Sequence, residues 1–155
     1  MTAEQTRIIY DRLALSAAPA DDDVALPFEL RQKARQTLLL TCGRPAGLML
    51  PRGTLLRHGV QVQSACGQIL RIDAAPERVS TVATQDLQLL ARTAYHLGNR
   101  HVWVQVGTGW LRYLHDHVLD DMVRGLDPGL HLSLELLPFE PEAGAYYEHG
   151  AGHSH

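Results

Sequence analysis

Apolar and polar residues alternate with a period of two in several short runs of the first half of the chain. In the clearest run, Val60 and Val62 alternate with Gln61 and Gln63, as in a strand with one buried face. Turns that contain glycine or proline separate the runs. The pattern predicts an all-β N-terminal domain over residues 1–74, with strands at Arg7–Leu13, Gln36–Thr41, Ala46–Leu50, Gly59–Gln63 and Gln68–Ile72.

The apolar spacing becomes helical after residue 74. Apolar residues recur three and four positions apart between residues 84 and 98, which predicts an amphipathic helix there. Thr84 is expected to cap its N-terminus, and Gly98 is expected to take the left-handed conformation that ends many helices. The same spacing predicts a second helix that begins after an Asp116 cap and ends at Gly125.

Strand-like runs precede, separate and follow these two helices. With the turn Gly107–Gly109 as a hairpin connection, the order of elements is βαββαβ, which predicts a ferredoxin-like domain over residues 75–142 and an α+β fold for the whole chain. Residues 143–155 have no apolar period and are expected to form a disordered, histidine-containing tail. The expected strands are Glu77–Ala83, His101–Val106, Trp110–Leu114 and Leu130–Leu137.

The charge and the apolar runs exclude several classes of protein. The formal net charge is −3 with acidic and basic residues interspersed, so the chain lacks the basic surface that a nucleic acid requires. No apolar run approaches the roughly 20 residues that cross a bilayer, and the N-terminus lacks a signal-peptide pattern. We therefore expect a cytoplasmic protein with neither a nucleic-acid nor a membrane partner.

The lysine and cysteine residues carry no recognisable site. Lys33 is the only lysine and lies outside any Gly-Lys-Ser/Thr sequence, so a partner must supply any nucleotide hydrolysis. Cys42 and Cys66 are not at a metal-ligand spacing and are expected to be small, semi-buried thiols.

Histidine is over-represented, with 9 residues, and neutral imidazole is a common ligand of divalent metal ions. His115 and His117 flank Asp116, and residues two apart at an extended strand end project to the same side, so the two rings could chelate one ion. The alternative is a solvated corner between strand and helix, in which Asp116 only caps the helix. The spacing does not decide between them.

His101 follows the turn after the first helix and is expected near the surface. A lone histidine is more often a hydrogen-bonded structural residue than a ligand, and one protein ligand cannot hold a metal selectively. A two-fold dimer would change this, because it places the same side chain of both subunits near the axis.

The C-terminus contains His149, His153 and His155. A flexible histidine-rich terminus binds Zn, Cu or Ni ions weakly and adds ligands to a site on the folded body at high effective concentration. The alternative is the remnant of an expression tag. His58 and His131 have no partner at a useful spacing and are interpreted as structural or solvated.

Three long motifs carry a family resemblance: AYHLGNRH (Ala94–His101), LRYLHDHVLDDMVRGL (Leu111–Leu126) and LPFEPEAGAY (Leu137–Tyr146). LPFELRQKAR (Leu26–Arg35) and GLMLPRGTLLRHG (Gly47–Gly59) extend it into the first half. Together they closely resemble the UreE family of urease accessory proteins, which are nickel metallochaperones. The resemblance covers nearly the whole chain.

The resemblance implies a β-rich N-terminal domain similar to a peptide-binding chaperone module, and a metal-binding ferredoxin-like domain that forms a homodimer. It implies that His101 binds Ni²⁺ at the dimer interface with its symmetry mate, and that His115 and His117 form a peripheral metal site. The tail histidines would join the interfacial ion or store further metal. The implied partners are the urease accessory GTPase and the urease apoprotein complex. Trp103 departs from the family, which usually has proline there.

The predicted function is therefore a non-catalytic nickel carrier, and Zn²⁺ or Cu²⁺ could occupy the same imidazoles in vitro. One rival is a metallohydrolase in which Asp116, Asp120 or Glu148 acts as the base. Its ligands would be spread over a strand, a corner and a tail, which is a poor arrangement for catalysis. A second rival is a protein-binding chaperone with incidental metal binding. Asp120 and Asp121 are otherwise interpreted as a solvated helix face.

Overall fold

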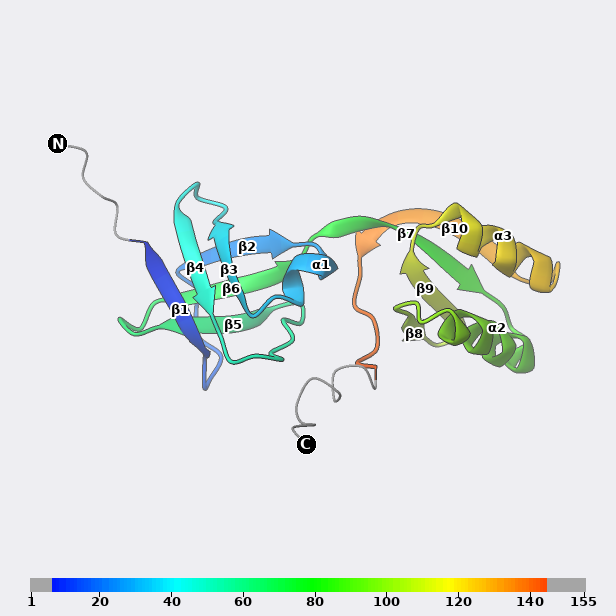
Figure 1. The fold of residues 1–155 in the computed structure, drawn as a ribbon, viewed down its shortest axis with the longest axis horizontal. Coiled ribbons are helices and arrows are strands. Elements are labelled where there is room, and N and C mark those ends of the chain that lie inside the picture. The colour runs from blue at the N-terminus through cyan, green and yellow to red at the C-terminus, as the bar shows by residue number, and fades with distance from the viewer. Residues whose placement is uncertain (1–6, 145–155) are drawn as a thin grey trace, which may run out of the picture. The chain divides into compact units, whose positions relative to one another are not determined.

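A computed structural model of the chain describes residues 7–144 (Figure 1). The chain divides between Ala74 and Ala75 into two compact units. The first consists mostly of strands and the second combines strands with two helices, so the predicted α+β fold is confirmed. No helix in the described part of the chain is long and apolar enough to cross a membrane.

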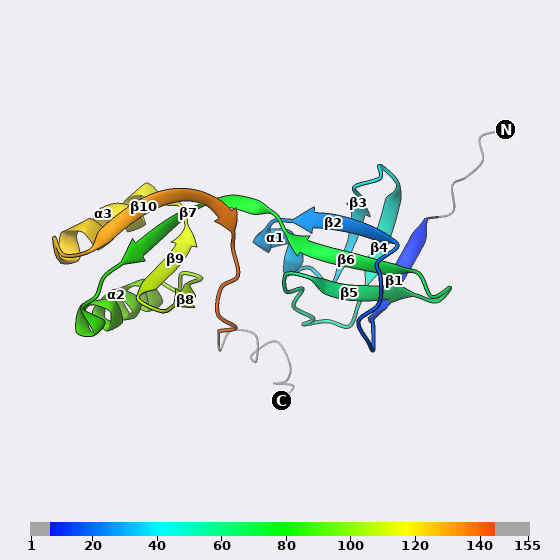
Figure 2. The same ribbon diagram turned by 180° about the vertical axis from the view of Figure 1, so that it is seen from behind.

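The first unit is a curled six-stranded sheet in the order β2-β6-β5-β1-β4-β3 (Figures 1 and 2). A backbone hydrogen bond of 3.0 Å from the Thr41 N–H to the Asp23 carbonyl links the β3–β4 hairpin to β2, which makes the sheet barrel-like. Its buried face includes Tyr10, Leu48 and Ile72. The elements are β1 (Ile8–Leu13), β2 (Asp22–Leu26), α1 (Phe28–Arg31), β3 (Arg35–Leu39), β4 (Pro45–Met49), β5 (Val60–Ser64) and β6 (Ile69–Ala74).

The second unit has a four-stranded antiparallel sheet in the order β10-β7-β9-β8. Its two helices pack on one face of the sheet around Val82, Leu97, Leu111, Tyr113, Leu119 and Val123. This arrangement is the ferredoxin-like fold that the order of elements predicted. The elements are β7 (Pro76–Ala83), α2 (Leu87–Asn99), β8 (Gln105–Gly107), β9 (Trp110–Leu114), α3 (His117–Leu126) and β10 (His131–Pro138).

The caps of the two helices differ in how well the sequence predicted them. Asp86, not Thr84, caps α2, and its carboxylate accepts hydrogen bonds from the N–H groups of Gln88 and Leu89. Thr84 directly follows β7, and its N–H donates to the Gly109 carbonyl at 3.1 Å. The Asp116 cap of α3 is confirmed.

Residues 139–144, which we call the C-terminal strap, run from the end of β10 to β8 (Figure 2). Phe139 is fully buried. The Glu140 N–H donates to Gln105 Oε1 at 3.0 Å, and the Glu142 N–H donates to the Val104 carbonyl at 2.8 Å. These contacts fix the path of the strap along the edge strand of the sheet.

Candidate metal centre

His101 follows α2 at the left-handed position of a Schellman motif. Its φ is 55°, and its N–H donates to the Gly98 carbonyl at 3.0 Å. The Val102 N–H donates to the Leu97 carbonyl at 3.5 Å. These two bonds satisfy carbonyls that a helix end leaves unpaired, and Leu97 and Val102 belong to the same apolar core, as is usual for the motif.

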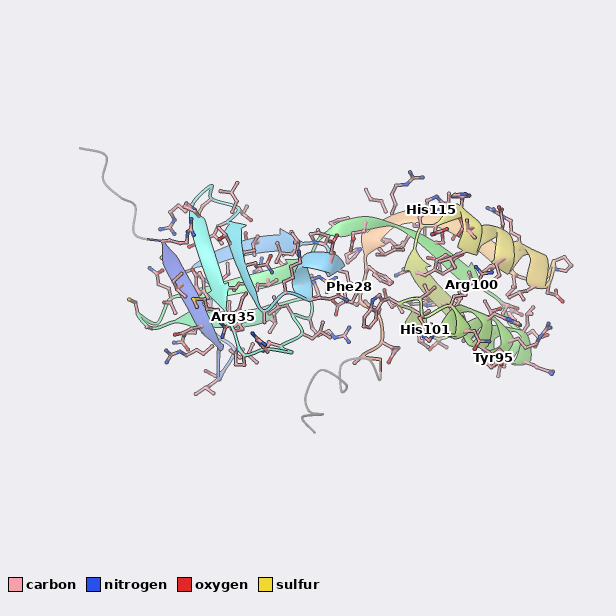
Figure 3. The ribbon with its side chains drawn as sticks, in the orientation of Figure 1. Phe28, Arg35, Tyr95, Arg100, His101 and His115 are labelled. Carbon is pink, nitrogen blue, oxygen red and sulfur yellow. The ribbon has the colours of Figure 1, made fainter. Side chains whose placement is uncertain are left out.

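The predicted strand from His101 is therefore wrong, and so is the left-handed conformation predicted for Gly98. Gly98 lies inside α2, and β8 begins only at Gln105. Among residues 7–144, His101 is the one non-glycine residue with a positive φ. Such residues are uncommon, although histidine tolerates this conformation better than most, and they are frequent at functional positions. The His101 residue is exposed, and Figure 3 labels its position after α2.

An apolar hollow of about 390 Å³ adjoins His101. It is formed by the second half of α2, the segment before and within β8, and the C-terminal strap. Val106, on this surface, is 53% exposed. His101 and Glu142 are the only lining residues with ionisable side chains. The lining residues are Ala94, Gly98, His101, Val102, Trp103, Val104, Val106, Glu142 and Gly144.

His115 directly follows β9, and two side chains hold its imidazole. Its Nδ1 lies 3.1 Å from Asp120 Oδ2 and 3.3 Å from Ser80 Oγ. The backbone N–H of His115 donates to the Arg78 carbonyl at 3.0 Å, which extends the pairing of β9 with β7 by one residue. Because the side chain is 25% exposed, the ring is neither sealed in the core nor free in solvent.

His117 is the first residue of α3 and is exposed. The prediction that His115 and His117 share one extended strand end is wrong, because β9 ends at Leu114 and a helix begins at His117. Asp116 Oδ1 accepts hydrogen bonds from the N–H groups two and three residues further on, at 2.8 and 3.3 Å. The capping role that the sequence left open is therefore present, but His115 is more ordered than a solvated corner implies.

Asp120 is the most informative residue that the sequence interpretation missed. The sequence predicts a solvated helix face for it, but it is 2% exposed. Tyr113, itself fully buried, donates its hydroxyl proton to Asp120 Oδ1 at 2.6 Å. Burial, and then the hydrogen bond to Asp120, raise the pKa of Tyr113 above its usual value, so the phenol remains a donor. A buried chain of polar groups thus runs from Tyr113 through Asp120 to His115.

The other histidines of residues 7–144 make contacts of their own, away from His101 and His115. His58 Nδ1 accepts a hydrogen bond from the Ala74 N–H at 2.9 Å, in agreement with a structural role. His131 is exposed at the start of β10, and His96 makes an edge contact with the Tyr95 ring. Four predicted site residues lie outside the described residues: His149, His153, His155 and Glu148, the last of which is a candidate base in the metallohydrolase alternative. Both cysteines, expected to be semi-buried, are exposed.

Figure 3 shows His101 and His115 at separate places on the second unit. Within residues 7–144 no group of three or more His, Cys, Asp or Glu side chains is close enough to hold a metal ion. A firm metal site that uses His101 would therefore need ligands from elsewhere, either from a second subunit or from the part of the chain beyond Gly144.

The fold and these side chains define a two-unit protein that presents separate histidines on a ferredoxin-like domain. The chain belongs to the UreE family of urease accessory proteins. The family model for the UreE N-terminal domain matches residues 6–75, and that for the UreE C-terminal domain matches residues 77–155. The resemblance that the motifs indicated is thereby confirmed.

Individual relatives agree over most of their length. The urease accessory protein UreE of Alkalilimnicola ehrlichii is 57% identical over 130 residues, which are 84% of this chain and 78% of the relative. UreE of Alcanivorax borkumensis is 50% identical over 156 residues, covering 97% of this chain and 88% of the relative. UreE of Pseudomonas putida strain W619 is 59% identical over 124 residues, which are 79% of this chain and 76% of the relative. The family places this chain in urease maturation.

Proposed function

We propose that this protein is a nickel metallochaperone, and not an enzyme, that acts in the cytoplasm as a homodimer. In this proposal a Ni²⁺ ion is cargo, bound by His101 of both subunits at their interface. It then passes, with the urease accessory GTPase, to the urease apoprotein complex. The observation that carries the proposal is the conformation of His101, an exposed imidazole held in the left-handed region beside an apolar hollow, in a chain that belongs to the UreE family.

The apolar hollow supports the dimer. Exposed apolar surface rimmed by few charged groups is characteristic of interaction sites, and a two-fold axis near His101 would bring two imidazoles together while covering that surface. Val106, which lines the hollow, is 53% exposed, and Tyr95 of α2 is 66% exposed. One ring per subunit thus becomes a pair of ligands only in the dimer.

The C-terminal strap supports a contribution from the tail histidines. Gly144, the last described residue, lines the hollow beside His101. His149, His153 and His155 follow within 11 residues, so their effective concentration at the His101 pair is high for a short tether. Few neutral ligands give firm but reversible binding, which suits an ion that must be handed on.

The proposal is tested by calorimetric Ni²⁺ titration combined with light scattering. His101→Ala should lose the tightest site, and a variant that ends at Tyr147 should lose stoichiometry and some affinity. His131→Ala is the matched control, because His131 is also an exposed histidine of the second unit, and it should bind as the wild type does. Tight binding that survives in His101→Ala, or a monomer in the nickel-loaded wild type, would refute the proposal.

His115 and His117 are proposed as a second, peripheral site. His115 is the stronger candidate of the two, since its ring is already ordered by Asp120 and Ser80. Zn²⁺ and Cu²⁺ are expected to compete for both sites in vitro, because imidazole binds all three ions.

A further inference from the structure

Asp120 has a buried carboxylate whose two oxygens both have polar partners. Removing a carboxylate from water is unfavourable unless both of its oxygens find partners. Oδ1 accepts the hydroxyl proton of Tyr113 at 2.6 Å, and Oδ2 lies 3.1 Å from Nδ1 of His115. Tyr113 is 0% exposed and Asp120 2% exposed, so neither group is rescued by bulk solvent.

This arrangement determines which nitrogen of His115 carries the proton. An ionised carboxylate can only accept, so the contact with Asp120 requires an N–H at Nδ1. In the neutral ring the lone pair is then on Nε2, the nitrogen that Asp120 does not engage. Ser80 Oγ, 3.3 Å from the same Nδ1, is a second contact that restrains the ring, and Ser80 is fully buried.

His115 also lines a surface hollow of about 240 Å³. Arg78, Leu134, Glu135 and Leu136 line it with His115. Leu134 and Leu136 are 51% and 66% exposed, so the hollow is open to solvent. An ion in this hollow can therefore approach a ring whose Nδ1 is already engaged by Asp120 and Ser80.

We propose that Asp120 and Tyr113 are positioning residues that preform His115 as an Nε2 ligand for a divalent metal ion of the nickel or zinc class. The inference rests on the proposed metal-carrying function and adds to it the groups that set the tautomer and orientation of one ligand. A carboxylate that accepts from the second nitrogen of a ligating histidine fixes the ring and raises the basicity of the ligand. Tyr113 keeps the carboxylate oriented from behind.

A purely structural role for Asp120 would stabilise the fold without acting on a ligand, so the test must read the ring itself. Long-range ¹H–¹⁵N NMR spectra of the full-length, metal-free chain report the tautomer of each histidine, and His115→Gln identifies the His115 signals. Zn²⁺, which is diamagnetic, is then titrated while the His115 ring is followed. The variants are Asp120→Asn and Tyr113→Phe. Asp121→Asn is the matched control, because Asp121 is the adjacent residue of α3 with a 74% exposed side chain, paired only at 3.6 Å with Arg124.

In the wild type we expect His115 as the Nδ1–H tautomer, with Nε2 shifted by Zn²⁺. Asp120→Asn should change the tautomer population and raise the Zn²⁺ concentration for half-saturation of His115 by about 10- to 100-fold. Tyr113→Phe should give a smaller rise, which keeps the test valid if Asp120→Asn unfolds. Asp121→Asn should match the wild type in both measurements.

Two results would overturn the inference: an Nε2–H tautomer in the wild type, or a half-saturation in both Asp120→Asn and Tyr113→Phe equal to that of Asp121→Asn. A wild-type His115 ring that ignores Zn²⁺ while His101 responds would also overturn it and leave the interfacial site standing. If neither ring responds and no Ni²⁺ is taken up, the proposed function itself fails as well.

Discussion

Replacing His101 by glycine should stabilise the second unit while removing the proposed nickel ligand. His101 occupies the left-handed position of a Schellman motif with φ 55°, where glycine is the usual residue. A side chain costs about 1–2 kcal/mol in this conformation, whereas glycine costs roughly 0.5–1 kcal/mol through the entropy of the unfolded chain. Relative to His101→Ala, which also lacks the imidazole, His101→Gly should therefore have a free energy of unfolding higher by about 1 kcal/mol.

The measurement is urea unfolding of the metal-free variants, followed by tryptophan fluorescence. Both tryptophans, Trp103 and Trp110, lie in the second unit, so the signal reports the unit that carries His101. A difference of 1 kcal/mol corresponds to a shift in the urea midpoint of about 0.3–1 M, because m is about 1–3 kcal/mol/M for small domains. Repeating the unfolding at two protein concentrations separates this effect from dimerisation.

Nickel titration of the same two variants completes the test, and both should lose the tightest site to the same extent. If His101→Gly is no more stable than His101→Ala, the left-handed conformation is not what limits stability at this turn. If His101→Gly retains tight nickel binding, the imidazole is not the ligand. Either result would refute the reasoning.

Three further outcomes are expected. Gln105→Ala removes the acceptor of the Glu140 N–H and should loosen the C-terminal strap, so that the free energy of unfolding falls by about 1 kcal/mol. Nickel titration of this variant should then show a smaller contribution from the tail histidines. Arg31→Met removes buried hydrogen bonds to two backbone carbonyls, so the free energy of unfolding of the first unit should fall by about 3 kcal/mol in circular dichroism melts. The control is Arg35→Met at an exposed position, which should change this free energy by less than about 0.5 kcal/mol. The folded-state pKa of Tyr113 is raised above its usual 10.0, so with rising pH the unfolded chain loses the phenol proton first. The free energy of unfolding of the wild type should therefore fall above pH 10.0 more steeply than that of Tyr113→Phe. Parallel curves of the two proteins would contradict this.

Apolar periodicity located most of the helices and strands but not their ends. The run Asp22–Leu26 escaped prediction because its two aspartates hide a strand at one end of the sheet order, where Arg71 and Arg44 pair with them. Helix α1 has four residues, too few to show a helical period.

The turn at His101 was mispredicted because glycine is the usual left-handed residue and Gly98 was nearby. The helix end has the apolar pair usual for this motif: Leu97 and Val102, five residues apart, belong to the same apolar core, and the sequence does contain them. Asp120 was misplaced for a related reason, since its neighbour Asp121 made both look solvated. Position 120 is four residues after the Asp116 cap and three before the buried Val123, so helical spacing alone could have placed it on the inner face. The tyrosine and serine partners of this network come from other strands, and only the fold brings them together.

The hydrogen bonds from Glu140 and Glu142 to the β8 region have a practical consequence for anyone handling this protein. They place Gly144, the last described residue, beside the hollow that His101 lines. A purification tag fused after His155 would therefore be tethered close to the very turn whose metal affinity is to be measured, and a polyhistidine tag would compete for the ion. A tag fused before Met1 is joined to the first unit, which carries neither His101 nor His115, and is the better choice for metal-binding work.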